Sequence, residues 1–350
     1  MLFSTATKGY FVELSEHAVL LARTSALQPP FTVEEVREVA PGDEAALADA
    51  IAQLQPKRSP SGYLQANVAV FPARRLVRRH SLDLKRLKEP GYLQEVCAQQ
   101  FRVELEKYTI ALLRSDDGSD YDLAKAAHKE VMFCGLPVED IQSIQQRLLD
   151  QKLYPDRLEL GTVGTLGGLV DYLAHSGSKT PVLVLEIGGD TTHSFIVTAG
   201  GVEASRPIPQ GLDAMVPIVQ KELGLKDEEA AKRLFYSNTF DFTGMGPLLT
   251  KRLLKELQSS IGFYEVQTGQ SVGQLVTTQL APKLAWLEAA IATALGVTPL
   301  KLDATAWMKA RGITFSDVCA RVSHEPRWFG LLALMGRYDT THAHPAEAKK

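Results

Sequence analysis

The segment at residues 183–201, LVLEIGGDTTHSFIVTAGG, constrains the fold of this chain more than any other stretch. Two apolar runs flank a tight polar turn, and the second run ends at a further Gly-Gly pair. Such runs around a glycine turn predict a β-hairpin. The turn has two interpretations: its backbone N–H groups and hydroxyls could hold a phosphate, or it could simply join two strands.

A second segment, FVELSEHAVLLA at residues 11–22, follows the same plan. In both segments an apolar run is followed by an acidic residue, a small polar turn and another apolar run. Glu13 and Glu186 take the same place in the two copies, about 170 residues apart. A repeated supersecondary unit predicts two duplicated α/β halves, and a ligand would lie in the cleft between them.

Between these copies, residues 63–135 alternate strand, helix and strands, which predicts a small inserted α/β module. The sequence therefore divides into residues 1–62 and 136–180 as the first half, residues 63–135 as the inserted module and residues 181–350 as the second half. A glycine pattern, GTVGTLGGL at residues 161–169, is weak as a dinucleotide motif. We expect it to be a helix whose glycines allow close packing on the sheet.

Composition excludes several classes of function. A net charge of -3 gives no support to nucleic acid or an anionic membrane surface as a partner, and we expect no nucleic-acid partner and no direct membrane insertion. The basic run ARRLVRRH at residues 73–80 is either an anion or partner patch or, as we favour, the solvated face of an edge strand. The three cysteines and scattered histidines form no ligand pattern, so we expect reduced thiols and no metal site. No apolar run is long enough to span a bilayer, which predicts a cytoplasmic protein.

Four segments, taken in order, resemble a known superfold. They are CGLPVEDIQSIQQRLLDQKLYPDRLEL, LEIGGDTTHSFIVTAGGVEASRPIPQGLDAM, KELGLKDEEAAKRL and LLTKRLLKELQSSIGFYEVQTGQSVGQLVTT. Their order and spacing resemble the actin-like ATPases, and within them the PilM-like type IV pilus assembly proteins, which are similar to FtsA. The resemblance implies an actin-like (ASKHA) α/β fold of two duplicated halves with an inserted small α/β subdomain.

In that superfold two hairpins hold the phosphates of ATP, acidic residues hold Mg²⁺ and a glycine-rich turn accepts the adenosine. If a nucleotide binds here, the resemblance assigns it to two turns of this chain. The residues so assigned are Ser15, Gly188, Gly189, Asp190, Thr191 and Thr192.

The sequence departs from the superfold at the other walls of this site. The first turn reads Ser15-Glu16-His17, which puts a negative charge where phosphate oxygens would sit. The acidic positions are all glutamates, at 13, 159 and 186, and the helix start after the second hairpin reads Gly-Leu-Asp at residues 211–213. The adenosine turn reads Thr-Thr-Gln at residues 277–279, which would crowd a base. We therefore expect little or no binding of ATP or Mg²⁺, and no catalytic residue.

The interpretation we favour is a scaffold of a type IV pilus or related secretion platform. The resemblance implies that the cytoplasmic N-terminal tail of a PilN-like single-span membrane protein docks between the first half and the inserted module, at about residues 63–133, with other platform proteins as further partners. The protein would then lie at the inner membrane through its partner. The alternative is an ATP-binding actin-like protein with slow ATPase activity and nucleotide-dependent assembly. A sugar or acid kinase is a third class, but no carboxylate stands out as its base.

Overall fold

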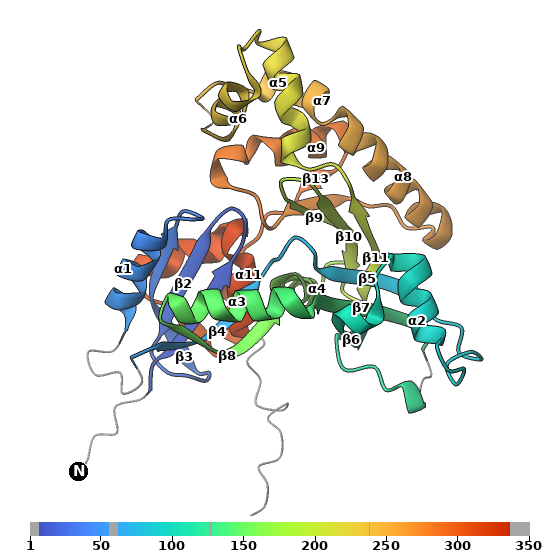
Figure 1. Ribbon diagram of the computed structural model, residues 1–350, viewed down its shortest axis with the longest axis horizontal. Coiled ribbons are helices and arrows are strands. Elements are labelled where there is room, and N and C mark those ends of the chain that lie inside the picture. Colours follow the sequence, from blue (N-terminus) through green and yellow to red (C-terminus); the bar gives the residue numbers. More distant parts are fainter. Residues whose placement is uncertain (1–6, 56–61, 126–127, 238, 337–350) are drawn as a thin grey trace, which may run out of the picture.

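The computed structural model describes residues 7–55, 62–125, 128–237 and 239–336, which form three sheets and the helices around them. A sheet of six strands and a sheet of three strands lie side by side in the lower body, and a sheet of five strands rises above them into a helical lobe (Figure 1). The turn after β1, at residues 15–18, and the glycine turn at residues 188–191 meet in the cleft between body and lobe. No helix in the described part of the chain is long and apolar enough to cross a membrane.

The first sheet begins with the predicted hairpin, whose strands β1 (Gly9–Leu14) and β2 (Val19–Thr24) pair antiparallel. Alternate residues of β1 face opposite sides: Val12 packs with helices α1 (Glu44–Leu54) and α3 (Val138–Asp150), and Phe11 packs with α4 (Gly161–Ser176) and α11 (Phe329–Gly336). Helices therefore cover both faces of this sheet. Its other strands, in chain order, are β3 (Phe31–Val39), β4 (Leu64–Val70), β8 (Leu153–Leu160) and β14 (Ile313–Phe315).

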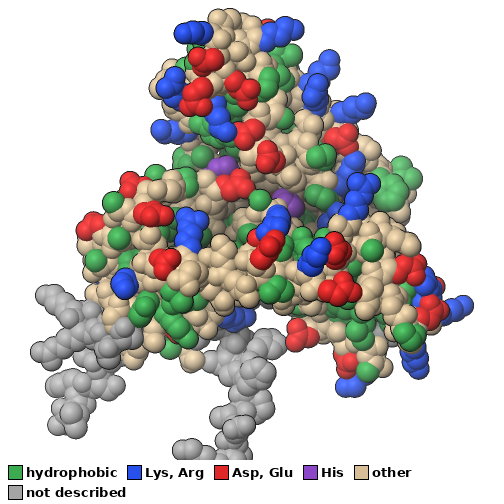
Figure 2. Space-filling view, in the orientation of Figure 1, with side chains coloured by type: hydrophobic (Ala, Val, Ile, Leu, Met, Phe, Trp, Pro, Cys, Tyr) green, Lys and Arg blue, Asp and Glu red, His purple; other side chains and the backbone are tan. Residues whose placement is uncertain are grey.

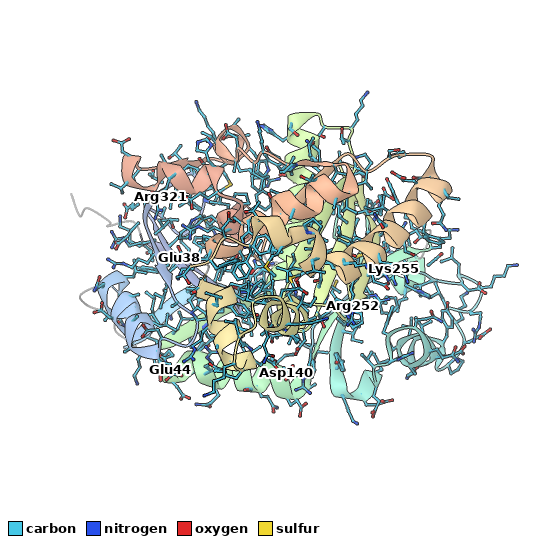
Figure 3. The ribbon with its side chains drawn as sticks, turned by 90° about the horizontal axis from the view of Figure 1, so that it is seen from above. Glu38, Glu44, Asp140, Arg252, Lys255 and Arg321 are labelled. Carbon is cyan, nitrogen blue, oxygen red and sulfur yellow. The ribbon has the colours of Figure 1, made fainter. Side chains whose placement is uncertain are left out.

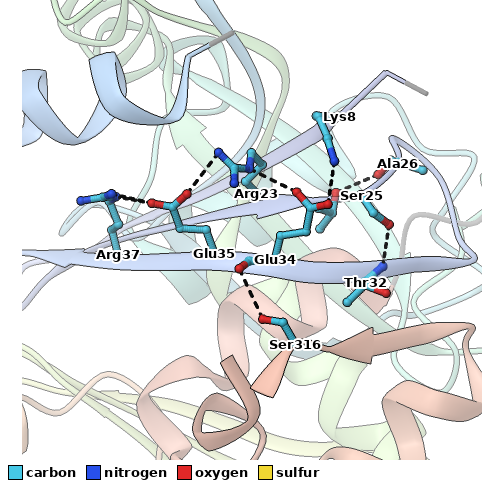
Figure 4. Close-up of polar contacts among 10 residues, drawn as sticks. Lys8, Arg23, Ser25, Ala26, Thr32, Glu34, Glu35, Arg37 and Ser316 are labelled. Carbon is cyan, nitrogen blue, oxygen red and sulfur yellow. Dashed lines mark hydrogen bonds and ion pairs between the residues drawn. The ribbon is translucent and has the colours of Figure 1, made fainter. Parts of the chain in front are cut away.

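The end of the chain returns to this first sheet, although the sequence analysis places all of residues 181–350 in the second half. Strand β14 pairs parallel with β3, and the Ser316 hydroxyl donates to the Glu34 carbonyl at 3.3 Å (Figure 4). Trp307, on α10 (Thr305–Ala310), and Trp328 are buried in the same core as α4. Three strand residues are too few to give a period-2 signal, so only the long-range pairing reveals the return. An ion-pair chain on the outer face of β2 and β3 links Lys8, Glu34, Arg23, Glu35 and Arg37.

The second sheet contains the predicted hairpin of β9 (Val182–Ile187) and β10 (Thr192–Thr198), and β11 (Gly201–Ile208) pairs antiparallel with β10. The parallel strands β12 (Gln274–Thr277) and β13 (Thr298–Pro299) complete it. One face of β9 packs against the helical lobe and the other against α4. The helices of the lobe are α5 (Val216–Glu222), α6 (Glu228–Ser237), α7 (Gly246–Leu249), α8 (Lys251–Thr268) and α9 (Trp286–Leu295).

The third sheet is small and has the order β5-β7-β6. We call this sheet, with its short helix α2 (Tyr92–Val96), the inserted module. Strand β4, which the sequence analysis assigns to this module, is instead an inner strand of the first sheet, because its buried run pairs with β1 and β8. The strands of the module are β5 (Leu76–Ser81), β6 (Tyr108–Arg114) and β7 (Glu130–Pro137).

The glycines that the sequence analysis singled out permit close contacts. On α4, a Cβ at Gly161 would overlap the Phe71 ring, and a Cβ at Gly168 would lie 2.5 Å from the Ala333 Cβ of α11. At the tip of the β10–β11 hairpin, Gly201 has φ +130° and lies against the Ser115 carbonyl of the inserted module. Small residues therefore hold helix against helix, and the second sheet against the inserted module.

Candidate functional site

Most of the predicted phosphate-binding residues line one cavity of about 240 Å³ between the body and the lobe. We call residues 15–18, between β1 and β2, turn 1, and residues 188–191, between β9 and β10, turn 2. Ser15 of turn 1 and all four residues of turn 2, Gly188, Gly189, Asp190 and Thr191, reach this cavity. Thr192 does not, because it is buried as the first residue of β10 and donates its hydroxyl to the Gln210 carbonyl at 2.7 Å.

Turn 2 is a closed loop rather than an open set of donors. The Gly188 N–H bonds to the Thr191 carbonyl across the turn at 3.0 Å. The N–H groups of Leu212 and Asp213, at the helix start after β11, donate to the Gly188 and Gly189 carbonyls, both at 2.9 Å. A Cβ at Gly211 would overlap those two carbonyl oxygens, so only glycine allows this approach. Turn 2 is therefore fixed rigidly against the second half.

Turn 1 contacts turn 2 across the cleft. A Glu16 carboxylate oxygen accepts the Gly189 N–H at 2.9 Å, and His17 Nε2 lies 2.9 Å from the Ile187 carbonyl oxygen. Ser15 does not reach across, because its hydroxyl accepts the His17 and Ala18 N–H groups and donates to the Ala18 carbonyl. From the sequence, Glu16 is expected to repel an anion at turn 2; in the structure this side chain also bonds to the turn itself.

A buried arginine lies at the base of the cavity. Arg75 Nη2 contacts the Glu186 carboxylate at 2.8 Å, and its Nε donates to the Thr162 hydroxyl, also at 2.8 Å. Thr162 in turn donates to Glu186 at 2.7 Å. The side chains of Arg75 and Glu186 are only 7% and 2% exposed. One guanidinium thus joins the entrance of the inserted module, the start of α4 and strand β9.

Glu13, the other acidic residue of the repeat, is also buried, but its hydrogen-bond partner is an amide rather than a guanidinium. Gln279 donates its side-chain amide to Glu13 Oε1 at 3.0 Å, while Oε2 has no hydrogen-bond partner among the described residues. Burial raises the pKa of Glu13 from its ordinary 4.5 to about 8; the Gln279 bond opposes this shift, and the nearby Glu186 carboxylate adds to it. Glu13 therefore holds a proton at neutral pH.

The charges around the cavity are of both signs. Burial, reinforced by Arg75 and Arg78, lowers the pKa of His193 to about 3, so its ring is neutral. Burial and the hydrogen bond to Asp213 raise the pKa of Tyr236 far above its usual range, and the charges of Glu16 and Asp190 act in the same direction. Figure 2 shows histidine side chains in the hollow between lobe and body. The cavity is thus lined by the carboxylates of Glu16, Asp190 and Asp213 and, at its base, by the Arg75–Glu186 ion pair.

The turn at residues 277–279 is filled by its own side chains. The Thr277 N–H and hydroxyl both donate to Glu288, at 2.7 and 2.5 Å. Thr278 is fully buried, and its N–H bonds to the Leu185 carbonyl at 3.2 Å. The cavity beside this turn measures about 20 Å³, room for roughly one water molecule.

The described residues include no cluster of three or more His, Cys, Asp or Glu side chains that could hold a metal ion. Glu159, the remaining one of the three acidic positions, pairs with Arg157 on the same strand. The carboxylates of Glu13 and Glu186 are near each other, but a guanidinium already contacts the second. The arrangement joins the parts of the protein through internal ion pairs and hydrogen bonds.

A second cavity, of about 250 Å³, lies between the inserted module, α4 and β11; we call it the groove. Its rim carries Arg114, Asp116, Asp117 and Asp171. Val202 supplies the edge from the second half, and its N–H donates to the Ser115 carbonyl at 2.7 Å. Apolar side chains form the walls: Val77, Leu113, Met132, Cys134, Val163, Leu166 and Val170.

No family model matches the chain, and no curated protein is significantly similar to it. Among solved structures, the chain superposes on the PilM-PilN type IV pilus biogenesis complex with a TM-score of 0.65 and 19% identity, over 93% of this chain and 97% of that one. The chain has the fold of PilM. The predicted actin-like fold class is thereby confirmed.

Two further similar structures are more distant. A Bacteroides thetaiotaomicron protein with an actin-like ATPase fold and unknown function has a TM-score of 0.45 at 9% identity, covering 95% of this chain and 98% of that one. The ethanolamine utilization protein EutJ from Carboxydothermus hydrogenoformans has a TM-score of 0.44 at 11% identity, covering 94% and 89%.

The residue that sequence reasoning missed is Arg75. It lies in the basic run interpreted as the solvated face of an edge strand, and β5 is indeed an edge strand. Arg74 is exposed as expected and pairs with Glu139 and Asp140, whereas Arg75 is buried. The sequence pattern does not separate the two arginines, because the contact of Arg75 with Glu186 joins residues 111 positions apart.

Proposed function

We propose that this protein is an adaptor of a type IV pilus or related secretion platform that works without a nucleotide. Its groove binds the cytoplasmic N-terminal tail of a PilN-like membrane protein, and this partner holds it at the inner membrane. The likeness to PilM, solved as part of a PilM-PilN complex, supports the proposal. The observation that carries it is the groove itself, an apolar cavity between three parts of one fold.

The groove has the chemistry that an extended peptide requires. Its apolar walls can bury one or two aliphatic side chains, and the charged residues of its rim at the turn after β6, Arg114, Asp116 and Asp117, pair with one another. In the third sheet β6 pairs only with β7, but beside the groove its other edge already bonds to the segment that follows it: the Tyr121 N–H donates to the Leu112 carbonyl at 2.9 Å and the Arg114 N–H to the Ser119 carbonyl at 2.8 Å. The groove therefore offers a peptide apolar contact rather than an open strand edge.

The residues of the cleft do not fit the Mg²⁺-nucleotide that the actin-like fold implies. The Gly189 N–H already bonds to Glu16, and Glu186 already bonds to Arg75. At the place of the adenosine turn, Thr277 and Gln279 bond to internal carboxylates, and the adjoining cavity holds about one water. We therefore assign no step of the function to ATP.

The proposal is tested by the affinity of the protein for a synthetic N-terminal tail of the PilN-like protein encoded in the same genome. Val170 of α4 is partly buried and lines the groove. V170E places a charge against the apolar ligand, so we expect tail binding to weaken by about tenfold or more, because burying an unpaired charge costs over 1.4 kcal/mol. Fluorescence anisotropy of the labelled tail measures the affinity.

The matched control is V266E, the same substitution on α8 at a valine that is 87% exposed and outside the groove. It should bind the tail like the wild type. Equal binding by V170E and the wild type, with both folded, would exclude the groove as the docking site. Loss of binding in V266E alone would place the partner on α8 instead.

A further inference from the structure

The contact between turn 1 and turn 2 has the form of a bound anion. Glu16 approaches turn 2 at the point where a backbone N–H is exposed to the cleft, and its Oε2 accepts the Gly189 N–H at 2.9 Å. The same oxygen lies 3.0 Å from the place where a Cβ on Gly188 would be, so a side chain there would crowd the carboxylate. The two glycines of turn 2 thus accommodate a carboxylate supplied by this chain itself.

The chemistry of the two groups explains the fit. A glycine turn with inward N–H groups binds anions through partial positive charge, and a carboxylate is the side-chain group most similar to a phosphate oxygen pair. Hydrogen bonds to an ionised acceptor are about twice as strong as neutral ones. The neighbouring His17–Ile187 contact comes from the same turn, so turn 1 is held to strand β9 and turn 2 at two points.

A cation accompanies this anion. Arg75 places a guanidinium against the buried Glu186 carboxylate, one residue before the Ile187 carbonyl that His17 contacts. Within the cleft, the Glu16 carboxylate therefore contacts turn 2 and the Arg75 guanidinium contacts Glu186. A metal–phosphate pair would bring the same two charges from outside.

We propose that Glu16 is an internal substitute for a phosphate and that it latches the two halves of the protein together across the cleft. The latch is intramolecular, so it holds the two halves together at any nucleotide concentration. Arg75 completes the arrangement by joining the inserted module to Glu186. The inference concerns the cleft alone and does not depend on which peptide the groove binds.

Hydrogen–deuterium exchange of the fragment covering turn 2 tests the latch. In E16A the Gly189 N–H loses its partner, and we expect exchange at turn 2 to accelerate about tenfold or more, the fold-change that corresponds to a hydrogen bond to a charged group. E16Q keeps an acceptor oxygen without the charge and should fall between E16A and the wild type. Far-UV circular dichroism and the thermal midpoint establish that each variant is folded.

The control is D190N, which removes one negative charge from turn 2 but breaks no cross-cleft bond that the structure shows. It should exchange like the wild type. If E16A exchanges no faster than D190N, the contact does not hold the cleft and the proposal is wrong.

Rescue by inorganic phosphate separates a phosphate substitute from an ordinary hydrogen bond. Phosphate added to E16A should slow exchange at turn 2 at least several-fold toward the wild-type rate, because it can occupy the vacated N–H. The same phosphate should leave the wild type unchanged, because Glu16 already occupies that position. Failure of phosphate to slow exchange in E16A, or equal slowing in both proteins, would overturn the assignment of Glu16 as a phosphate substitute.

Discussion

At the scale of single residues, the cleft places two buried glutamates with different partners at equivalent positions of a repeat. Glu13 is buried without a cation, whereas Glu186 contacts Arg75. Glu13 keeps its proton up to about pH 8 in the folded protein but only up to about pH 4.5 in the unfolded chain. The protonated side chain therefore makes its full contribution to the free energy of unfolding below pH 4.5. That contribution is lost as the pH rises through 8.

The consequence is a pH dependence that one substitution should remove. We expect E13Q, which cannot ionise and keeps an oxygen for the Gln279 amide, to be more stable than the wild type above pH 5. The difference should grow by about 1.4 kcal/mol for each pH unit between roughly pH 4.5 and 8. Chemical denaturation across that range measures it. The control E44Q, at an exposed position of α1 (Figure 3), should follow the wild type, and parallel curves for E13Q and the wild type would refute the assignment.

A second residue-scale prediction concerns the glycine that faces Glu13. A Cβ at Gly330 of α11 would overlap Glu13 Oε2 and lie 3.1 Å from the Thr165 hydroxyl. We expect G330A to destabilise the protein by about 1–3 kcal/mol through overpacking. G262A, in α8 where a Cβ meets open space, should instead stabilise by about 0.5–1 kcal/mol through helix propensity. Urea denaturation compares the two, and equal effects would contradict this account.

These residue-scale features were only partly predictable from the sequence. The repeat of Glu13 and Glu186 and the glycine turn were visible, because both lie in short periodic segments. The partner of each group was not: Glu16 bonds to a residue 173 positions away, and Gln279 to one 266 positions away. Such pairings depend on how two sheets face each other, which local pattern does not encode.

At the scale of elements, the stretch from the end of β4 to the start of β5 connects the three parts of the fold. Arg75 lies on it and touches Thr162 of α4 and Glu186 of β9. We expect R75A to cost about 3–5 kcal/mol in the free energy of unfolding, because it leaves the Glu186 charge buried and unpaired. R75A/E186Q should recover part of this loss, since the remaining group is neutral. Guanidinium denaturation measures both variants.

Its neighbour supplies the control for this prediction. Arg74 is exposed and pairs at the surface with Glu139 and Asp140, the latter labelled on α3 in Figure 3. Exposed ion pairs contribute little, so R74A should leave the unfolding midpoint nearly unchanged. Equal losses in R74A and R75A would mean that burial does not distinguish the two arginines.

The elements themselves were predicted better than their grouping. The β1–β2 hairpin, the β9–β10 hairpin and the helix at α4 agree with the sequence patterns. Strand β4 was grouped with the wrong sheet because a continuous buried run suits any inner strand. Likewise β14 is too short to carry a pattern, although it completes the first sheet.

At the scale of the whole molecule, the halves are interleaved. The first sheet includes strands from both ends of the described chain, and one core contains residues of β1, α4, β9 and α11. The groove needs the inserted module, α4 and Val202 of the second half together. A fixed relation between the halves is therefore a condition for the groove to exist, and the cleft contacts supply that relation from within.

The last prediction follows from this internal closure. A ligand that binds the folded state raises its stability by RT ln(1 + [L]/Kd), about 2.7 kcal/mol at a concentration one hundred times the Kd. To enter the cleft, Mg-ATP would have to displace Glu16 from turn 2 and Arg75 from Glu186. We therefore expect saturating Mg-ATP to leave the thermal midpoint of the wild type unchanged, as measured by scanning calorimetry, whereas the PilN-like tail should raise it. A midpoint that rises with Mg-ATP but not with Mg²⁺ alone would show that the cleft opens to a nucleotide.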